Sequence, residues 1–135
     1  MYTISKVLSA NDTSETGAHQ AGMLIPKRPD VLDFFPSLSK EEKNPRVHIF
    51  FVDDSGKKWE FAFIYYNNKY FGGTRNEYRL TRMTRYLKES NLIEEDEVLL
   101  TEDNGNYFVS YKRKNNGSSS TGTLKLGSGW QVIQI

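Results

Sequence analysis

The chain has 135 residues, of which 37% are hydrophobic and 26% are charged. This length and composition are typical of one folded globular domain, so they exclude a disordered chain and a membrane protein. The absence of cysteine excludes disulfides, thiolate zinc sites and cysteine nucleophiles. The net charge of +1 favours no particular partner, and because no apolar segment has signal-peptide length we expect a cytoplasmic protein.

The first half of the chain predicts a loop, a short helix and a β-hairpin. Residues 11–22 are polar and glycine-punctuated, so we expect an exposed loop, with a short strand at 22–26. A helix should begin at Pro29, with Asp30 in its first turn. Residues 46–53 and 58–66 are apolar segments on either side of the sequence Asp-Ser-Gly-Lys, which predicts a hairpin.

The second half predicts the same kind of structure. Residues 69–76 are polar and contain two glycines, so they should form an exposed loop, and a second helix is expected from Thr81 to Glu89. Residues 97–101 and 107–111 flank the turn sequence Asp-Asn-Gly-Asn, which predicts a second hairpin. A flexible Ser/Gly-rich loop at 115–122 and a final strand at 130–135 follow. The expected fold is a single, mainly β domain with short helices.

Basic residues are concentrated between Asn67 and Lys88, where six stand against a single acidic residue, Glu77. This block carries a net charge of +5, so the rest of the chain carries −4. A block of this kind is typical of an anion-binding surface, although a basic face that is merely solvated remains an alternative.

Arg75, Glu77 and Arg79 alternate within this block, so on an extended segment their side chains face the same way. An arginine matches guanine O6 and N7, a glutamate accepts from cytosine N4, and an amide such as that of Asn76 can bridge adenine N6 and N7. A carboxylate would only repel phosphates. Glu77 therefore favours reading of G·C base edges over simple phosphate binding.

Two segments resemble one known family. Residues 8–13 (Leu-Ser-Ala-Asn-Asp-Thr), continuing through 17–20 (Gly-Ala-His-Gln) to 24–26 (Leu-Ile-Pro), resemble the amino-terminal arm of the effector domain of EcoRII-type restriction endonucleases. Residues 65–69 (Tyr-Tyr-Asn-Asn-Lys), with Phe-Gly at 71–72, Thr-Arg-Asn-Glu at 74–77, Arg79 and Thr-Arg at 81–82, resemble the second arm of that domain.

This resemblance implies a B3-like DNA-binding pseudobarrel, a seven-stranded open barrel whose two arms enter the major groove of double-stranded DNA. In such enzymes the module binds a short CC(A/T)GG-like site and regulates a separate catalytic domain. The whole chain, 1–135, would then be the amino-terminal module of a larger type II restriction enzyme, monomeric when isolated and located in the bacterial cytoplasm. The implied module has no active site, cofactor, metal or membrane contact of its own, and Mg²⁺ is expected only in the separate nuclease domain.

The resemblance, which implies contacts for His19, Arg75, Glu77 and Arg79, and the basic block, which suggests phosphate contacts, together lead to expected roles for individual residues. The residues expected to read bases are His19 in the first arm and Arg75, Asn76, Glu77 and Arg79 in the second. The residues expected to contact the DNA backbone or to support the arms are Asn11, Asp12, Thr13, Gln20, Lys69, Gly73, Thr74, Tyr78, Arg82, Arg85 and Lys88.

Two functions of other classes stay open. Pro29-Asp30 followed by Glu41-Glu42-Lys43 has the residue order of a metal-dependent nuclease motif, but that chemistry needs its carboxylates on adjoining strands, and residues 39–44 have no strand pattern. The aromatic residues from Phe50 to Tyr66 could stack on single-stranded nucleic acid, although packing in the core explains them more simply. We interpret His48 as a structural residue of its strand, and Asp53, Asp54 and Lys57 as turn residues.

Overall fold

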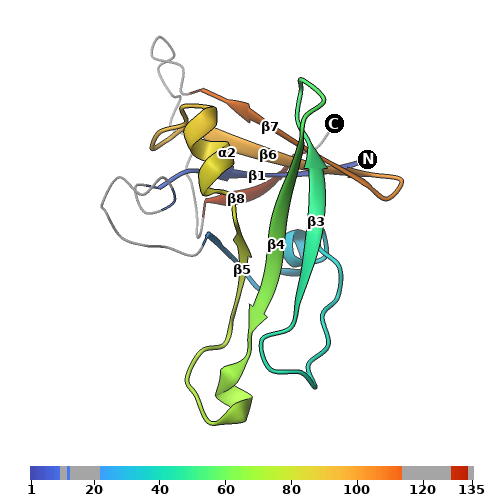
Figure 1. Ribbon diagram of the computed structural model, residues 1–135, viewed down its shortest axis with the longest axis vertical. Helices are drawn as coiled ribbons and strands as arrows, with labels where there is room; N and C mark the ends of the chain where they lie inside the picture. The colour runs from blue at the N-terminus through green and yellow to red at the C-terminus, as the bar shows by residue number, and fades with distance from the viewer. Residues whose placement is uncertain (10–11, 13–21, 114–128, 134–135) are drawn as a thin grey trace.

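Eight strands form one curled, open sheet in the computed structural model, which describes residues 1–9, 12, 22–113 and 129–133 (Figure 1). The strands are β1 (Tyr2–Val7), β2 (Met23–Ile25), β3 (Arg46–Val52), β4 (Lys58–Tyr66), β5 (Glu77–Thr81), β6 (Glu97–Asp103), β7 (Asn106–Lys112) and β8 (Trp130–Ile133). Their order in the sheet is β2-β5-β4-β3-β7-β6-β1-β8. Two short α-helices, α1 (Pro29–Leu32) and α2 (Thr84–Glu89), and a 3₁₀ helix, η1 (Asn68–Phe71), complete the elements.

Both expected hairpins are present. Strands β3 and β4 pair antiparallel around a turn in which the Asp53 carboxylate accepts hydrogen bonds from the backbone N–H groups of Ser55 and Lys57, both at 2.9 Å. Strands β6 and β7 pair around Asn104 and Gly105, whose φ angles of 53° and 84° are those that an Asn-Gly hairpin turn requires. The interpretation of the Asp53 segment as turn chemistry is confirmed.

The two edge strands of the sheet meet through side chains. The indole N–H of Trp130 in β8 donates to the Leu24 carbonyl of β2 at 2.9 Å, and the Arg28 guanidinium donates to the Trp130 carbonyl at 3.2 Å. No backbone ladder joins β2 to β8 among the described residues. The sheet therefore curls into an open pseudobarrel whose seam depends on side-chain hydrogen bonds.

The first strand, β1, was not among the elements expected from the pattern of the sequence. It lies between β6 and β8 in the sheet. The four residues from Thr3 to Lys6 are all buried, so buried and exposed positions do not alternate along this strand, and three of its buried residues are polar. With β1 the sheet has eight strands, one more than the resemblance implied.

The core fills the inside of the curled sheet and is closed by α2, whose Tyr86 and Leu87 are buried. Most of the aromatic residues of β3 and β4 are buried, which confirms the core interpretation for them, but Phe50 is 59% exposed and was wrongly assigned to the core. It faces outward because it alternates with the buried Ile49 and Phe51. Other core members are Ile4, Leu8, Met23, Ile25, Val31, Phe34, Phe35, Trp59, Phe61, Phe63, Leu80, Met83, Leu92, Val98, Leu100, Val109 and Trp130.

The second helix begins later than expected. Thr81 is the last residue of β5, where its hydroxyl donates to the Ala62 carbonyl at 3.2 Å, and Arg82 has a left-handed backbone with φ of 68°. Helix α2 therefore begins at Thr84, because the left-handed residue must turn the chain out of the sheet first. The expected loop at 115–122 lies outside the described residues, as do the last two residues of the expected terminal strand.

Candidate nucleic-acid interface

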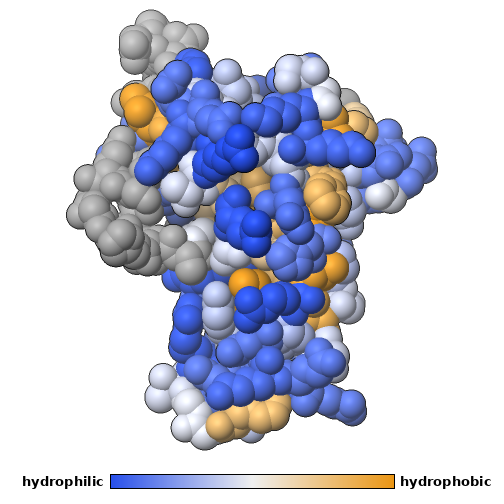
Figure 2. Space-filling model, in the orientation of Figure 1, coloured by the Kyte–Doolittle hydropathy of each residue, from blue (hydrophilic) through white to orange (hydrophobic). Residues whose placement is uncertain are grey.

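The expected second arm is a long hairpin loop between β4 and β5, comprising residues 67–76 and the adjoining strand ends (Figure 1). It extends away from the body of the sheet, with η1 at its tip. Its surface is largely hydrophilic on the side in view, with an apolar patch at the far end (Figure 2). Tyr70 and Phe71 in η1 are 65% and 43% exposed. The polar loop predicted at 69–76 is thus exposed, although η1 gives its first half regular structure.

The base of the second arm is fixed by a buried asparagine. Asn67 is 0% exposed, and its amide donates to the Glu42 carbonyl at 2.8 Å and accepts from the backbone N–H of Asn44 at 2.7 Å. Because both polar ends of the amide are paired, burial costs little, and the loop before β3 is tied to the arm. Residues 41–43 are therefore part of the arm's support and have no strand structure.

The turn of the second arm is organised around Asn68. Its side-chain oxygen accepts from the backbone N–H of Arg75 at 2.6 Å, and its backbone carbonyl accepts from Gly73 at 2.7 Å. A Cβ at Gly73 would lie 2.7 Å from the Asn68 side chain. The second glycine is thus required by close packing within the turn, which sets the backbone position of Arg75.

The three charged residues lie together on one face, as their spacing predicts. Oε2 of Glu77 accepts hydrogen bonds from the guanidinium of Arg75, at 3.2 Å, and from Nε of Arg79. The Arg75 guanidinium also stacks on the Tyr66 ring, 3.8 Å from its centre. The side chains of Arg75, Glu77 and Arg79 are 42%, 29% and 17% exposed.

Burial acts to raise the pKa of Glu77, but the hydrogen bonds from Arg79 and Arg75 outweigh it and hold the pKa below its usual value. The carboxylate is therefore charged at neutral pH, with one oxygen shared between two arginines. This arrangement fixes both guanidinium groups before any ligand binds.

The residues between the charged ones support the arm. Tyr78 points to the opposite face, where its ring stacks on Tyr65 at 4.2 Å and on Phe63 at 5.6 Å between centres. The Asn76 side-chain oxygen accepts from the Tyr65 hydroxyl at 2.8 Å. In this state the amide oxygen of Asn76 is occupied, so contact with an adenine N6 would require it to exchange partners.

The first arm is connected to the second at its carboxyl end. The Arg79 guanidinium donates to the Gly22 carbonyl at 3.1 Å, directly before β2, and β2 pairs with β5 so that Leu24 lies opposite Arg79. Gly22 has φ of 84°, and a Cβ there would lie 2.0 Å from the Leu80 carbonyl oxygen. The chain can therefore enter β2 this close to β5 only through glycine.

The amino-terminal end of the first arm is held by a buried ion pair. Lys6 Nζ lies 2.7 Å from Asp12 Oδ2, with side-chain exposures of 8% and 9%, and the same carboxylate accepts from the Ser9 backbone N–H at 2.9 Å. Asp12, expected to support the first arm, is thus bound to Lys6 of β1. The other residues expected in this arm, Asn11, Thr13, His19 and Gln20, lie outside the described residues.

The basic block of the sequence does not form a single patch. Lys69 and Thr74 are exposed on the arm, whereas α2, which carries Arg85 and Lys88, lies near the opposite end of the molecule from η1 (Figure 1). Arg85 donates to Glu89 and lies over the Trp59 ring, 5.9 Å from its centre. The basic block is therefore spread along the molecule, because β5 carries the chain between the two groups.

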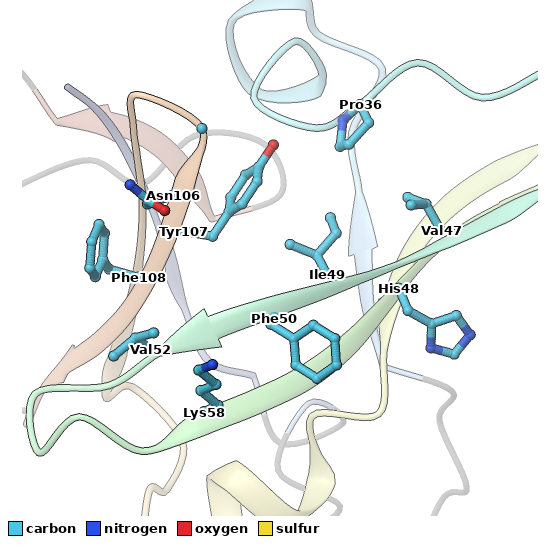
Figure 3. Close-up of a pocket in the computed structure, with 11 residues that line it drawn as sticks. Pro36, Val47, His48, Ile49, Phe50, Val52, Lys58, Asn106, Tyr107 and Phe108 are labelled. Atoms are coloured by element: carbon cyan, nitrogen blue, oxygen red, sulfur yellow. The ribbon is translucent and has the colours of Figure 1, made fainter.

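A pocket of about 490 Å³ lies on the other side of β4 from β5, between β3 and the β6–β7 turn (Figure 3). Its lining is mostly apolar and includes Phe50, Tyr107 and Phe108. The polar His48 at its edge has Nδ1 2.9 Å from Glu60 Oε2, which agrees with a structural role. The arginines of the second arm are not among its lining residues.

The residues of the nuclease-like motif do not converge on strands. Asp30 lies in α1, paired with Arg28 at 3.1 Å, and residues 41–43 lie in the loop before β3. The described part of the chain contains no group of three or more His, Asp or Glu side chains that could hold a metal ion. It also contains no helix long and apolar enough to cross a membrane.

Residues 1–98 match a protein-family model described as restriction endonuclease EcoRII, N-terminal. The match covers more than half of the chain and includes both arms. This chain belongs to the EcoRII N-terminal family. The sequence resemblance is thereby confirmed.

Members of the EcoRII N-terminal family include parts of much longer proteins. Type II restriction enzyme EcoRII of Escherichia coli is 46% identical over 86 residues, which are 60% of this chain and 20% of that enzyme. The solved structure of the Arabidopsis FUS3-DNA complex is similar with a TM-score of 0.65, over 85% of this chain and 100% of that chain, at 19% identity. Similarity at this identity concerns the fold, and it confirms the expected B3-like pseudobarrel.

Proposed function

We propose that this domain recognises a specific sequence of double-stranded DNA in the major groove, as the effector domain of a restriction endonuclease. The observation that carries the proposal is the group of Arg75, Glu77 and Arg79 on one face of a projecting arm, held together by shared hydrogen bonds. Membership of the EcoRII N-terminal family and the fold shared with a protein solved on DNA support it.

The chemistry of the group fits G·C base pairs. Arg75 and Arg79 present guanidinium N–H groups suited to guanine O6 and N7, while Oε1 of Glu77 has no hydrogen bond within the described residues and suits the N4 amine of cytosine. This chemistry suits a short site that contains G·C pairs, and the resemblance to EcoRII-type enzymes suggests one of the CC(A/T)GG kind. His19 in the first arm would read a further base. Asn76 in the second arm would read another base after its side-chain oxygen releases the Tyr65 hydroxyl.

The DNA backbone would be held by cations spread along the domain, from the second arm to α2. Lys69 on the second arm and Arg82 after β5 are exposed, as is Lys88 on α2. Each phosphate that such a residue neutralises releases counterions, so the affinity should fall steeply with salt. Arg85, which is paired with Glu89, has less of its charge available for this purpose.

In this proposal the domain recognises DNA and a separate domain cleaves it. The matched E. coli enzyme is about five times as long as the matched segment, which leaves room there for a catalytic domain. Mg²⁺ would act in that domain and not here. The isolated domain would be monomeric, and its place of action would be the bacterial cytoplasm, where the DNA is.

Selection of bound duplexes from a random library by the purified chain tests the proposal. We expect enrichment of one short site that contains G·C pairs, in the absence of divalent metal. A variant with Arg75 and Arg79 both changed to Ala should lose the enrichment, whereas Lys58→Ala, an exposed cation at the other end of β4, should keep it. Absence of any enriched site with the wild-type chain would reject the proposal.

The same chain tests the two other functional classes. Cleavage of duplex DNA that depends on Mg²⁺ would favour a nuclease, and tighter binding of single strands than of the matching duplex would favour a stacking function of exposed aromatic residues such as Phe50. Either result would replace the proposed function.

A further inference from the structure

Arg46 lies on the same face of the sheet as the charged group of the second arm. It is the first residue of β3 and pairs with Ile64 of β4, which in turn pairs with Arg79 of β5. Residues in register across neighbouring strands point to the same side. Arg46 and Arg79 therefore lie in one transverse row, with Ile64 between them.

The charge of Arg46 is available for a ligand. The residue is exposed, and within the ranges that the structure describes it has no ion pair or side-chain hydrogen bond. Ile64 is only 3% exposed although it faces outward, which agrees with coverage by the aliphatic stems of the arginines on either side. The next residue on this face of β3, His48, is paired with Glu60.

The position of Arg46 is fixed by the sheet. The Pro45 carbonyl accepts from the Tyr65 backbone N–H at 3.0 Å, and the β3–β4 pairing continues without a break to Val52. Two strand spacings of about 4.8 Å place the backbone of Arg46 about 10 Å to the side of Arg79. The major groove is about 12 Å wide, so an arginine at this lateral distance from a base-reading residue reaches the rim of the groove, where the phosphates lie.

We propose that Arg46 contacts a DNA phosphate and extends the interface from the arm onto β3. This inference rests on the proposed function, because it places the base edges at Arg79. Arg46 lies outside the basic block of the sequence and 33 positions before Arg79. It holds the duplex in position without reading its sequence.

The test compares Arg46→Gln with Lys58→Gln. Glutamine keeps much of the aliphatic stem over Ile64 and removes the charge. Lys58 is also an exposed cation on this face without an ion-pair partner in the described ranges, but it lies six residues along β4 from Ile64, about 20 Å away. Binding of the selected duplex and of a random duplex is measured by titration at salt concentrations from 50 to about 200 mM.

We expect Arg46→Gln to weaken binding of both duplexes by a similar factor and to reduce the slope of log K against log salt by about 0.9, the value for one phosphate. Lys58→Gln should leave the slope unchanged, and Arg46→Lys should restore it. An unchanged slope in Arg46→Gln, with the wild-type chain still selecting its site, would overturn the role of Arg46 while leaving the proposed function in place. A wild-type chain that selects no site would instead reject the proposed function itself.

Discussion

At the scale of single residues, Glu77 holds two arginines in place, and the proposed function gives it a second role as a reader of cytosine. Oε2 is shared by Arg75 and Arg79, which fixes the orientation of both guanidinium groups. Oε1 has no hydrogen bond within the described part of the chain, and the proposed function assigns it to a cytosine. A carboxylate between two arginines lowers the local positive charge, so it is a poor choice for a surface that binds phosphates alone.

Replacing Glu77 with Gln should therefore change specificity and affinity in opposite directions. Loss of the charge should strengthen binding to random duplexes, because repulsion of phosphates falls. Preference for cytosine at one position of the site should relax by about 1–3 kcal/mol. Site selection and titration with the variant measure both effects, and Glu60→Gln, which changes a carboxylate on the neighbouring strand, is the control. Unchanged base preference at every position would show that Glu77 does not read bases.

Asp53 gives the fold a dependence on acid pH. The hydrogen bond from the Trp59 indole, together with those from Ser55 and Lys57, lowers the pKa of Asp53 from 3.8 to about 2. Since the folded state has the lower pKa, this stabilisation is complete above about pH 5 and is lost progressively as the pH falls through 3.8 toward 2. In Asp53→Asn the side-chain amide group replaces the oxygen that accepts from the Trp59 N–H, so two donors meet. The variant should lower the free energy of unfolding by about 2 kcal/mol at pH 7.

Urea unfolding at pH 7, 4 and 2 measures this effect as the difference in free energy of unfolding between Asp53→Asn and the wild type. The difference should be slightly smaller at pH 4 than at pH 7 and much smaller at pH 2, where the folded wild-type carboxylate also becomes protonated. Asp54→Asn, an exposed neighbour in the same turn, should show no such trend. A constant difference over the whole range would contradict the assignment.

At the scale of elements, the two arms depend on how β2 joins β5. Gly22 and Gly56 both have left-handed backbones, with φ of 84° and 88°, but only Gly22 lacks space for a Cβ. Gly56→Ala should cost about 1 kcal/mol for the backbone conformation alone. Gly22→Ala should cost clearly more, because the methyl group meets the Leu80 carbonyl and must push β2 away from β5.

Urea unfolding of the two variants separates the clash from the backbone cost. Gly22→Ala should also reduce site preference, because it displaces the carbonyl that holds Arg79. Equal destabilisation of the two variants would mean that β2 does not need its close approach to β5.

The link between β5 and α2 allows charge and fold to be tested separately. Arg82 has a left-handed backbone, which glycine adopts without steric cost. Arg82→Gly should therefore raise the free energy of unfolding or change it by less than about 1 kcal/mol. The same change removes an exposed cation and should weaken binding to all duplexes alike. Thermal unfolding and salt titration of the variant measure the two effects, and normal binding by the stable variant would exclude Arg82 from the interface.

At the scale of the whole molecule, the pseudobarrel is closed where β8 meets β2. Trp130→Phe keeps most of the buried ring and removes the hydrogen bond to the Leu24 carbonyl. We expect a loss of about 1 kcal/mol in the free energy of unfolding. Because β2 pairs with β5 at Arg79, binding of the selected DNA site should weaken even where the variant is fully folded. Urea unfolding and DNA titration at a temperature where the variant is fully folded check both points, and unchanged values would show that the seam does not need this bond.

The sequence by itself determined the local features of this protein. The turn residues at Asp53 and at Asn104-Gly105 specify both hairpins, because few residue types adopt the backbone angles that such turns require. The alternation places Glu77 and Arg79 on one face of β5, because side chains of a strand repeat every two residues, and Arg75 just before the strand joins them through its hydrogen bond to Glu77. The two arm motifs were sufficient to identify the family.

The tertiary structure decided everything that depends on pairing between distant segments. Strand β1 shows no alternation of buried and exposed residues, and its place in the fold is set by backbone pairing with the distant strands β6 and β8. Phe50 and Phe51 are adjacent in sequence and point to opposite faces of β3. Which face is buried depends on the way the whole sheet curls, and this decides that Phe50 is the one exposed to solvent. The basic residues of the block lie in two groups because β5 runs along the molecule between the second arm and α2. Arg46 lies on the same face as Arg79 because the two residues are in register across β3, β4 and β5. Such contacts are set by the closure of the whole sheet, which no local pattern of residues specifies.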